Sequence, residues 1–80
     1  MNSYFEEIES RLIRDVISTN ENAIKQHDVN RNRVNYGCCI AWAEVLSDMG
    51  HKVELKVYEE DDYLKIARLE IDGKKIIECE

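Results

Sequence analysis

The chain has 80 residues, of which 44% are hydrophobic and 35% are charged, and its formal net charge at pH 7 is −6. These values are typical of one small globular domain and exclude an intrinsically disordered chain. The negative charge argues against direct binding to nucleic acid and favours a protein partner with a basic surface.

The N-terminal segment predicts an amphipathic helix. Ser3 followed by Glu6 is a capping-box pattern, and we expect the helix to end near residues 18–20. Its apolar stripe recurs at helical spacing and comprises Phe5, Ile8, Leu12, Ile13, Val16 and Ile17. Residues 21–27 are compatible with a further turn or two of helix or with a separate short helix. Residues 28–35 have no apolar period and are rich in asparagine, which predicts a loop.

A second helix is expected from Asn35 to Gly50, with Asn35 or Gly37 at its N-cap and Gly50 as a left-handed stop. The apolar residues cover well over half of its circumference and comprise Cys38, Cys39, Ile40, Trp42, Ala43, Val45, Leu46 and Met49. An ordinary surface helix has a narrower apolar face. We therefore expect this helix to be buried on two sides, between the first helix and a sheet.

After Gly50 the apolar period changes from 3.6 to 2, which predicts β-strands. The first strand covers residues 52–58 and is followed by an acidic turn at residues 59–62. The second strand covers residues 63–71, and its alternation slips near Ile66–Ala67. This slip indicates either a β-bulge or a strand that is buried on both faces.

The Asp72-Gly73 dipeptide is a strong signal for a two-residue hairpin turn. It would place Leu69 opposite Ile76 and Glu70 opposite Lys75, with the third strand running from Lys74 to about Cys79. The predicted fold class is therefore α+β, with two main helices, and a short third left open, packed on a three-stranded antiparallel meander. The order is α-(α)-α-β-β-β in a single domain over residues 1–80.

The Gly37-Cys38-Cys39 triplet opens the predicted second helix, where unpaired amides and the helix dipole lower the pKa of a thiol. This segment resembles the transglutaminase-like proteins, a cysteine-nucleophile group with a papain-like core. Matching positions are Gly37, Cys39, Trp42, Ala43 and Gly50, and the likeness covers roughly residues 36–79, including the Ile71-Asp72-Gly73-Lys74 hairpin.

This resemblance implies a cysteine-dependent transferase or hydrolase that uses Cys39 as its nucleophile. The family's histidine falls near Leu64 and its aspartate near Cys79, so neither partner is matched. His27 is then the candidate base, because His51 lies about 18 Å farther along the helix. The favoured interpretation of the residues themselves is that Cys38 and Cys39 are small buried core residues, and the active thiol is the alternative.

Neither a metal nor any other cofactor is predicted, because the cysteines and histidines lack the spacing of metal ligands. The side chains of Cys38 and Cys39 would diverge by about 100° on a helix and could not pair. No apolar run approaches the roughly 18 residues that span a bilayer, and the N-terminal residues lack the features of a signal peptide. We expect a cytosolic protein that does not act at membranes.

The favoured function is a non-catalytic binding module that docks on another macromolecule and regulates or inhibits it, with a nucleic-acid-binding protein as one candidate partner. Its expected contacts are Tyr58, Glu59, Glu60, Asp61, Asp62 and Tyr63, since aromatic residues beside carboxylates suit an interface. A solvated turn is the simpler interpretation of the same residues. Arg31 and Arg33 form a weaker candidate anion site. Self-association through the wide apolar helix is a third option.

Overall fold

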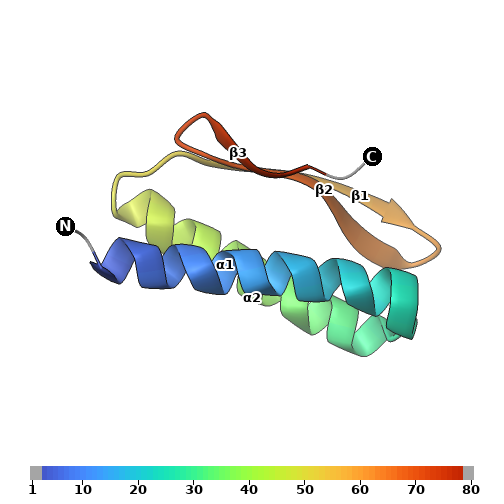
Figure 1. Cartoon of the computed structure of the whole chain (residues 1–80). Helices are drawn as coiled ribbons and strands as arrows, with labels where there is room; N and C mark the ends of the chain where they lie inside the picture. The colour runs from blue at the N-terminus through green and yellow to red at the C-terminus, as the bar shows by residue number, and fades with distance from the viewer. Residues whose placement is uncertain (1–2, 79–80) are drawn as a thin grey trace.

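The computed structural model describes residues 3–78 and contains two helical segments followed by a three-stranded sheet (Figure 1). The elements are α1 (Ser3–Glu21), the π-helical turn η1 (Asn22–Gln26), α2 (Val29–Asp48), β1 (Val53–Glu60), β2 (Tyr63–Ile71) and β3 (Lys74–Glu78). The strands are antiparallel in the order β1-β2-β3. The predicted α+β class and element order are therefore confirmed. The expected end of the third strand near Cys79 lies outside the described residues.

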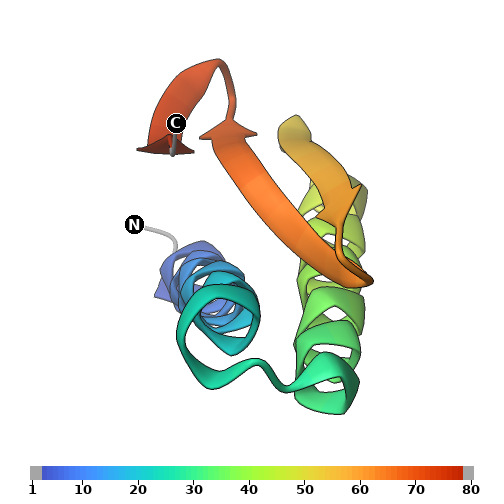
Figure 2. The same ribbon diagram turned by 90° about the vertical axis from the view of Figure 1, so that its right-hand side faces the viewer.

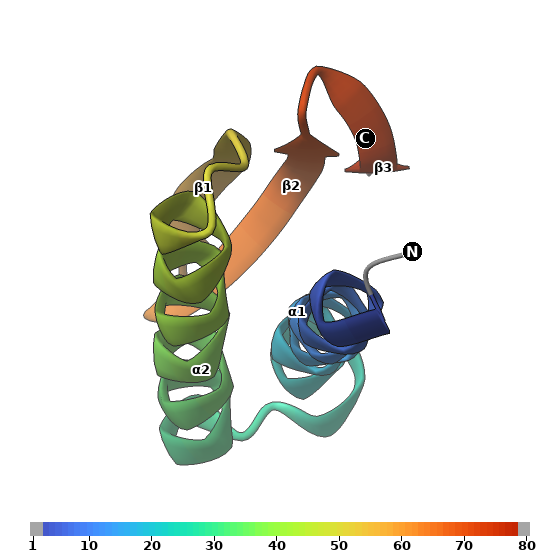
Figure 3. The same cartoon turned by 90° about the vertical axis from the view of Figure 1, so that its left-hand side faces the viewer.

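The two helices lie side by side in one layer, and the sheet crosses them as a second layer (Figures 2 and 3). The α2 helix lies beneath β1, and α1 lies on the side of β3. The expectation that the second helix lies between the first helix and the sheet is thus wrong. Its buried residues Asn32, Cys39 and Leu46 form a single stripe, whereas Val34 is 65% exposed and Ile40 is 39% exposed. Three strands spaced about 4.8 Å apart are wide enough to cover two adjacent helices.

The hydrophobic core lies between the two layers. It consists of Ile8, Leu12 and Val16 from α1, Cys39 and Leu46 from α2, and Ile66, Leu69 and Ile71 from β2. Most of the apolar stripe predicted for the first helix contributes to this core or packs against it. Ile17 departs from that prediction, because it is 48% exposed.

The loop predicted for residues 28–35 is wrong, because these residues form the first two turns of α2. Asp28 caps the helix, and its side chain accepts a hydrogen bond from the backbone N–H of Arg31 at 3.0 Å. The expected apolar period is missing because polar side chains occupy the buried side. Asn32 is fully buried, and Asn35 donates to the Asn22 side chain at 2.6 Å. The helical option is confirmed for residues 21–26, since η1 continues directly from α1, and His27 caps η1 in a left-handed conformation.

The slip of alternation in β2 is a β-bulge. Lys56 pairs with Arg68 and Val57 pairs with Ile66, so Ala67 is the extra residue. The bulge keeps both Ile66 and Leu69 on the helix-facing side of the sheet, where each is buried.

Both hairpins have two-residue turns with positive φ. The acidic turn is narrower than predicted, because Glu59 and Glu60 end β1 and only Asp61 and Asp62 form the turn. At the second hairpin the predicted Glu70–Lys75 pair is confirmed, whereas Leu69 pairs with Ile77. The expected Leu69–Ile76 pair is wrong because a second register shift lies between Leu69 and Glu70.

Candidate functional site

The tip of the β1–β2 hairpin is fixed against the first turns of α2. Arg33 donates from Nη2 to the backbone C=O of Asp62 at 3.0 Å and lies 3.6 Å from the Glu59 carboxylate. One residue earlier, the Asn32 side chain binds both the N–H and the C=O of Leu64 at 2.9 Å each. These contacts hold the tip in one position relative to the helices.

Two of the four acidic residues at the tip are neutralised locally. Glu59 faces Arg33, and Glu60 forms an ion pair with Lys65 at 2.5 Å. The hydrogen bond to Glu60 raises the pKa of Lys65.

Asp61 and Asp62 differ from these two residues, because neither carboxylate forms a hydrogen bond or an ion pair with any residue in the range 3–78. Both are exposed at the end of the hairpin. Tyr58 lies close by in β1 and is 48% exposed. Tyr63 is half-buried and meets the His27 ring edge-on, with centroids 6.2 Å apart. The six residues predicted as binding contacts are therefore all at one end of the sheet.

A comparison of the two turns sets Asp62 apart. The turn residues Asp72 and Gly73 have φ of 54° and 82°, and Asp61 and Asp62 have φ of 54° and 72°. Glycine at the second position adopts this left-handed conformation without steric cost, whereas aspartate, one of the few other residues that visit it, loses up to about 1 kcal/mol. Asp62 therefore occupies a position where glycine would suit the fold better.

Arg31 and Arg33, the weaker candidate anion site, lie in a helix instead of the predicted loop. Both lie in α2, and residues two apart on a helix point to different sides. The Arg33 guanidinium is already engaged by the hairpin tip. Arg33 instead serves to anchor the acidic tip.

Cys39 lies nearly three turns inside α2, because the helix begins at Val29. The helix-dipole argument for a lowered thiol pKa is therefore wrong for this residue. Cys39 has 0% of its surface exposed, and its Sγ lies 3.6 Å from Oγ1 of Thr19. Burial raises the pKa of the Cys39 thiol to about 11. A nucleophile requires a thiolate that a substrate can reach, whereas Cys39 is a neutral core residue. Cys38 is half-buried.

The two histidines have other partners. His27 follows η1 and contacts Tyr63, as described above. His51 stacks on Phe5 with ring centroids 4.1 Å apart, and its Nδ1 lies 2.7 Å from the Asp72 carboxylate. That carboxylate also accepts the backbone N–H of Lys52 at 2.9 Å. The pKa of Asp72 is lowered by the hydrogen bond with His51 and by the one from Lys52. This cluster joins the β2–β3 turn to the start of β1.

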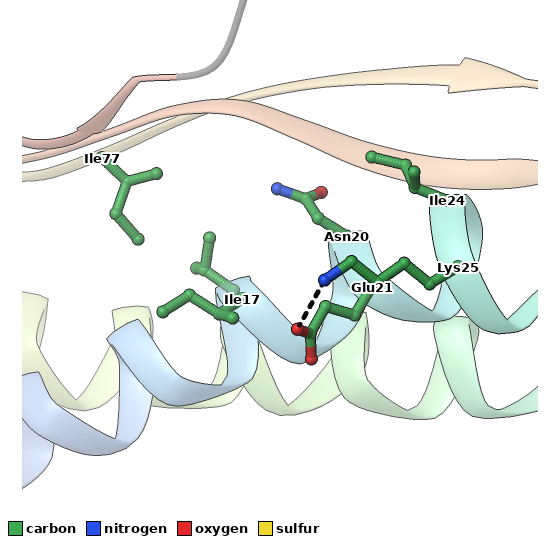
Figure 4. Close-up of a pocket in the computed structure, with 7 residues that line it drawn as sticks. Ile17, Asn20, Glu21, Ile24, Lys25 and Ile77 are labelled. Atoms are coloured by element: carbon green, nitrogen blue, oxygen red, sulfur yellow. Dashed lines mark ion pairs between the residues drawn. The ribbon is translucent and has the colours of Figure 1, made fainter.

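An apolar groove lies between α1, η1 and β3 (Figure 4). Its volume is about 180 Å³, and exposed Ile17 and Ile24 face Ile77 across it. At its rim Lys25 forms an ion pair with Glu21 at 3.7 Å. The groove offers apolar area but few polar groups to orient a ligand, so it is a weaker candidate for specific recognition than the hairpin tip.

The asparagines that join the layers were missed by sequence reasoning. Asn20 binds the backbone C=O and N–H of Ile66 at 3.0 Å and 2.8 Å, in the same manner as Asn32 at Leu64. The available signal was the density of asparagine between residues 20 and 35. Loops and polar helix contacts both produce such a density, so the signal does not distinguish them.

No family model, no curated protein and no solved structure matches this chain. Within residues 3–78, no helix is long and apolar enough to cross a membrane. The same residues contain no group of three or more His, Cys, Asp or Glu side chains that could hold a metal ion. The fold and the site define a class: a small acidic α+β domain in which two helices support a meander with an anchored acidic hairpin.

Proposed function

We propose that this protein is a non-catalytic binding module that docks on a basic macromolecular surface through the tip of its β1–β2 hairpin. The observation that carries the proposal is the pair of exposed carboxylates at Asp61 and Asp62, which form no ion pair within residues 3–78 and of which Asp62 occupies a position that favours glycine. Backbone strain at an exposed position is a typical sign of a residue kept for recognition.

The anchoring of the tip supports this function on energetic grounds. A flexible acidic loop loses conformational entropy when it binds, whereas a hairpin already held by Arg33 and Asn32 loses little. Tyr58, which is half-exposed beside the carboxylates, supplies an aromatic contact of the kind that dominates many interfaces.

The partner is expected to be a protein with a basic surface, and a nucleic-acid-binding protein is one such candidate. Carboxylates at a fixed spacing can occupy positions that phosphates would otherwise fill, and charge complementarity accelerates association. Binding at such a surface would block or modulate the partner. The net charge of −6 contributes to the same attraction.

The test uses a variant that removes the two charges and preserves the turn. Asp61→Asn/Asp62→Asn is isosteric, and asparagine tolerates positive φ. The matched control Glu44→Gln/Asp48→Asn removes two exposed charges from α2 instead. Each protein is immobilised, exposed to native cell extract at several salt concentrations, and its retained proteins are identified by mass spectrometry.

We expect a basic protein to be retained by the wild type and the control in a salt-dependent manner, and to be lost from the turn variant. Equal retention of every captured protein by all three baits would remove the hairpin tip from the interface and overturn the proposal.

A further inference from the structure

We propose that two copies of this chain associate through their β1 strands and form one continuous six-stranded antiparallel sheet. This inference is independent of the function proposed for the hairpin tip. It rests on three observations: an unpaired strand edge, like-charge pairs within the sheet, and one self-complementary register.

The outer edge of β1 presents unpaired backbone groups. Asn32 and Asn20 bind the N–H and C=O of Leu64 and Ile66 on the side of β2 that faces away from β1. In an antiparallel ladder the residues opposite them must direct their own backbone groups away from β2 as well. Those residues are Glu59 and Val57, and alternation extends the pattern to Leu55 and Val53. Within the described residues, no hydrogen bond reaches this edge of β1.

The exposed face of the sheet brings like charges together between β1 and β2. Glu54 lies opposite Glu70, and Lys56 lies opposite Arg68. Directly opposed like charges destabilise a strand pair. Ion pairs form along the strands instead, between Lys52 and Glu54 and between Arg68 and Glu70, each at 3.3 Å. Lys56 forms no ion pair with any residue in the range 3–78.

One register of pairing between two β1 strands places opposite charges next to each other. Hydrogen-bonded pairs across the new edge must join the odd-numbered residues of β1, because these carry the outward backbone groups. With the two-fold axis at Leu55, that residue pairs with Leu55 of the second copy, and Val53 pairs with Val57. Glu54 of each copy then lies directly opposite Lys56 of the other, in the non-hydrogen-bonded pairs whose side chains approach most closely.

The neighbouring registers are disfavoured. A shift that moves the two-fold axis by one residue places either Lys56 opposite Lys56 or Glu54 opposite Glu54. The favoured register also pairs the half-buried side chains of Val53, Leu55 and Val57 with one another on the helix-facing side. It therefore matches apolar residues on one face and opposite charges on the other.

The helix beneath β1 adds apolar area to the same edge. Arg33 of α2 reaches Glu59 at the end of β1, and Ile40 lies on the same side of α2, two turns farther along. Ile40 is 39% exposed. In the proposed dimer the two α2 helices meet below the joined strands and cover this residue. The two acidic tips then lie roughly 34 Å apart along the strands.

The test is a charge swap measured by sedimentation equilibrium. Wild-type protein should reach twice the mass of the chain as its concentration rises. Lys56→Glu places glutamates opposite each other and should raise the dissociation constant roughly tenfold or more. Glu54→Lys/Lys56→Glu restores opposite charges and should return the constant to within about threefold of the wild type. Lys74→Glu, an exposed change of the same type on β3, serves as the matched control and should have no effect.

Circular dichroism and urea unfolding establish that each variant is folded before its mass is measured. A wild type that remains monomeric up to about millimolar concentration would overturn the proposal. So would a dimer that tolerates Lys56→Glu, since it would use another surface, such as the apolar groove. Failure of the double variant to recover would reject the register.

Discussion

The side-chain amide of Asn32 on α2 pairs with both the N–H and the C=O of Leu64 on β2, at 2.9 Å each. Asn20 on α1 makes the same pair of contacts with Ile66. Both contacts lie where β3 no longer extends along β2, because β3 pairs only with Arg68–Ile71. The two side chains thus take the place of a neighbouring strand and satisfy backbone groups that the core would otherwise bury unpaired.

Replacing Asn32 by alanine should lower the free energy of unfolding by about 2–4 kcal/mol. Asn32 is fully buried and also donates to the backbone C=O of Thr19 at 2.8 Å. Its loss leaves buried backbone groups of Leu64 and Thr19 without partners. Urea denaturation measures the change, and Asn30→Ala, an exposed substitution in the same helix, is the control. A loss below about 1 kcal/mol would show that water replaces the amide.

The Asp62→Gly variant should be more stable than the wild type by up to about 1 kcal/mol, because glycine adopts φ near 72° without steric cost. The same variant should bind the captured basic partner more weakly, since a carboxylate is removed. Thermal unfolding measures the stability, and titration with the partner measures the affinity. Gly73→Ala provides the opposite case, because it introduces a side chain at positive φ and should destabilise the second hairpin. A variant that is both more stable and fully competent in binding would separate Asp62 from recognition.

Cys39 should react with iodoacetamide only when the protein opens. Its sulfur is fully buried and its thiol pKa is raised to about 11, so no thiolate is accessible near neutral pH. In a Cys38→Ser background, the peptide that carries Cys39 should be labelled at a rate that follows the unfolding equilibrium and increases with urea. In a Cys39→Ala background, half-buried Cys38 should be labelled faster. Rapid labelling of Cys39 in native buffer would return it to consideration as a nucleophile.

The Asp72 carboxylate should make folding stability depend on pH in the acid range. Its pKa in the folded protein is lowered from an ordinary value of 3.8 by His51 and by the backbone N–H of Lys52. A carboxyl with a lowered pKa stabilises the fold above its ordinary pKa, and this contribution is lost as pH falls through the lower folded-state value.

Asp72→Asn keeps a residue that tolerates positive φ but cannot ionise. The stability difference between wild type and this variant should therefore be larger at about pH 6 than at about pH 2.5, as measured by urea unfolding. Asp48→Asn, which changes an exposed carboxyl with no described partner, controls for net charge. A difference that stays constant with pH would mean that Asp72 acts only through turn geometry.

Local sequence signals determined the class of the fold. Apolar residues recur every 3.6 residues in the first helix and every 2 residues after Gly50, because one face of each element is buried. This periodicity predicts helix or strand without knowledge of tertiary contacts. The Asp72-Gly73 turn and the slip near Ile66–Ala67 could also be predicted, because positive φ and a broken alternation are properties of a few adjacent residues. Only the strand pairing showed that this slip is a β-bulge at Ala67. Residues 58–63 could be grouped at one site because they are consecutive and form the predicted turn of the β1–β2 hairpin.

Only the tertiary structure decided where α2 begins, how the helices lie and what the cysteines do. Half-buried Asn20 and fully buried Asn32 bond to β2 backbone groups more than thirty residues away, and no local pattern encodes such a partner. With the true helix start at Val29, Cys39 lies nearly three turns inside the helix instead of in its first turn, and it is fully buried. Hydrogen bonding can offset the cost of burying a polar side chain. Here the bonds from Asn20 and Asn32 to the β2 backbone hold both helices against the sheet, an arrangement that apolar periodicity alone could not reveal.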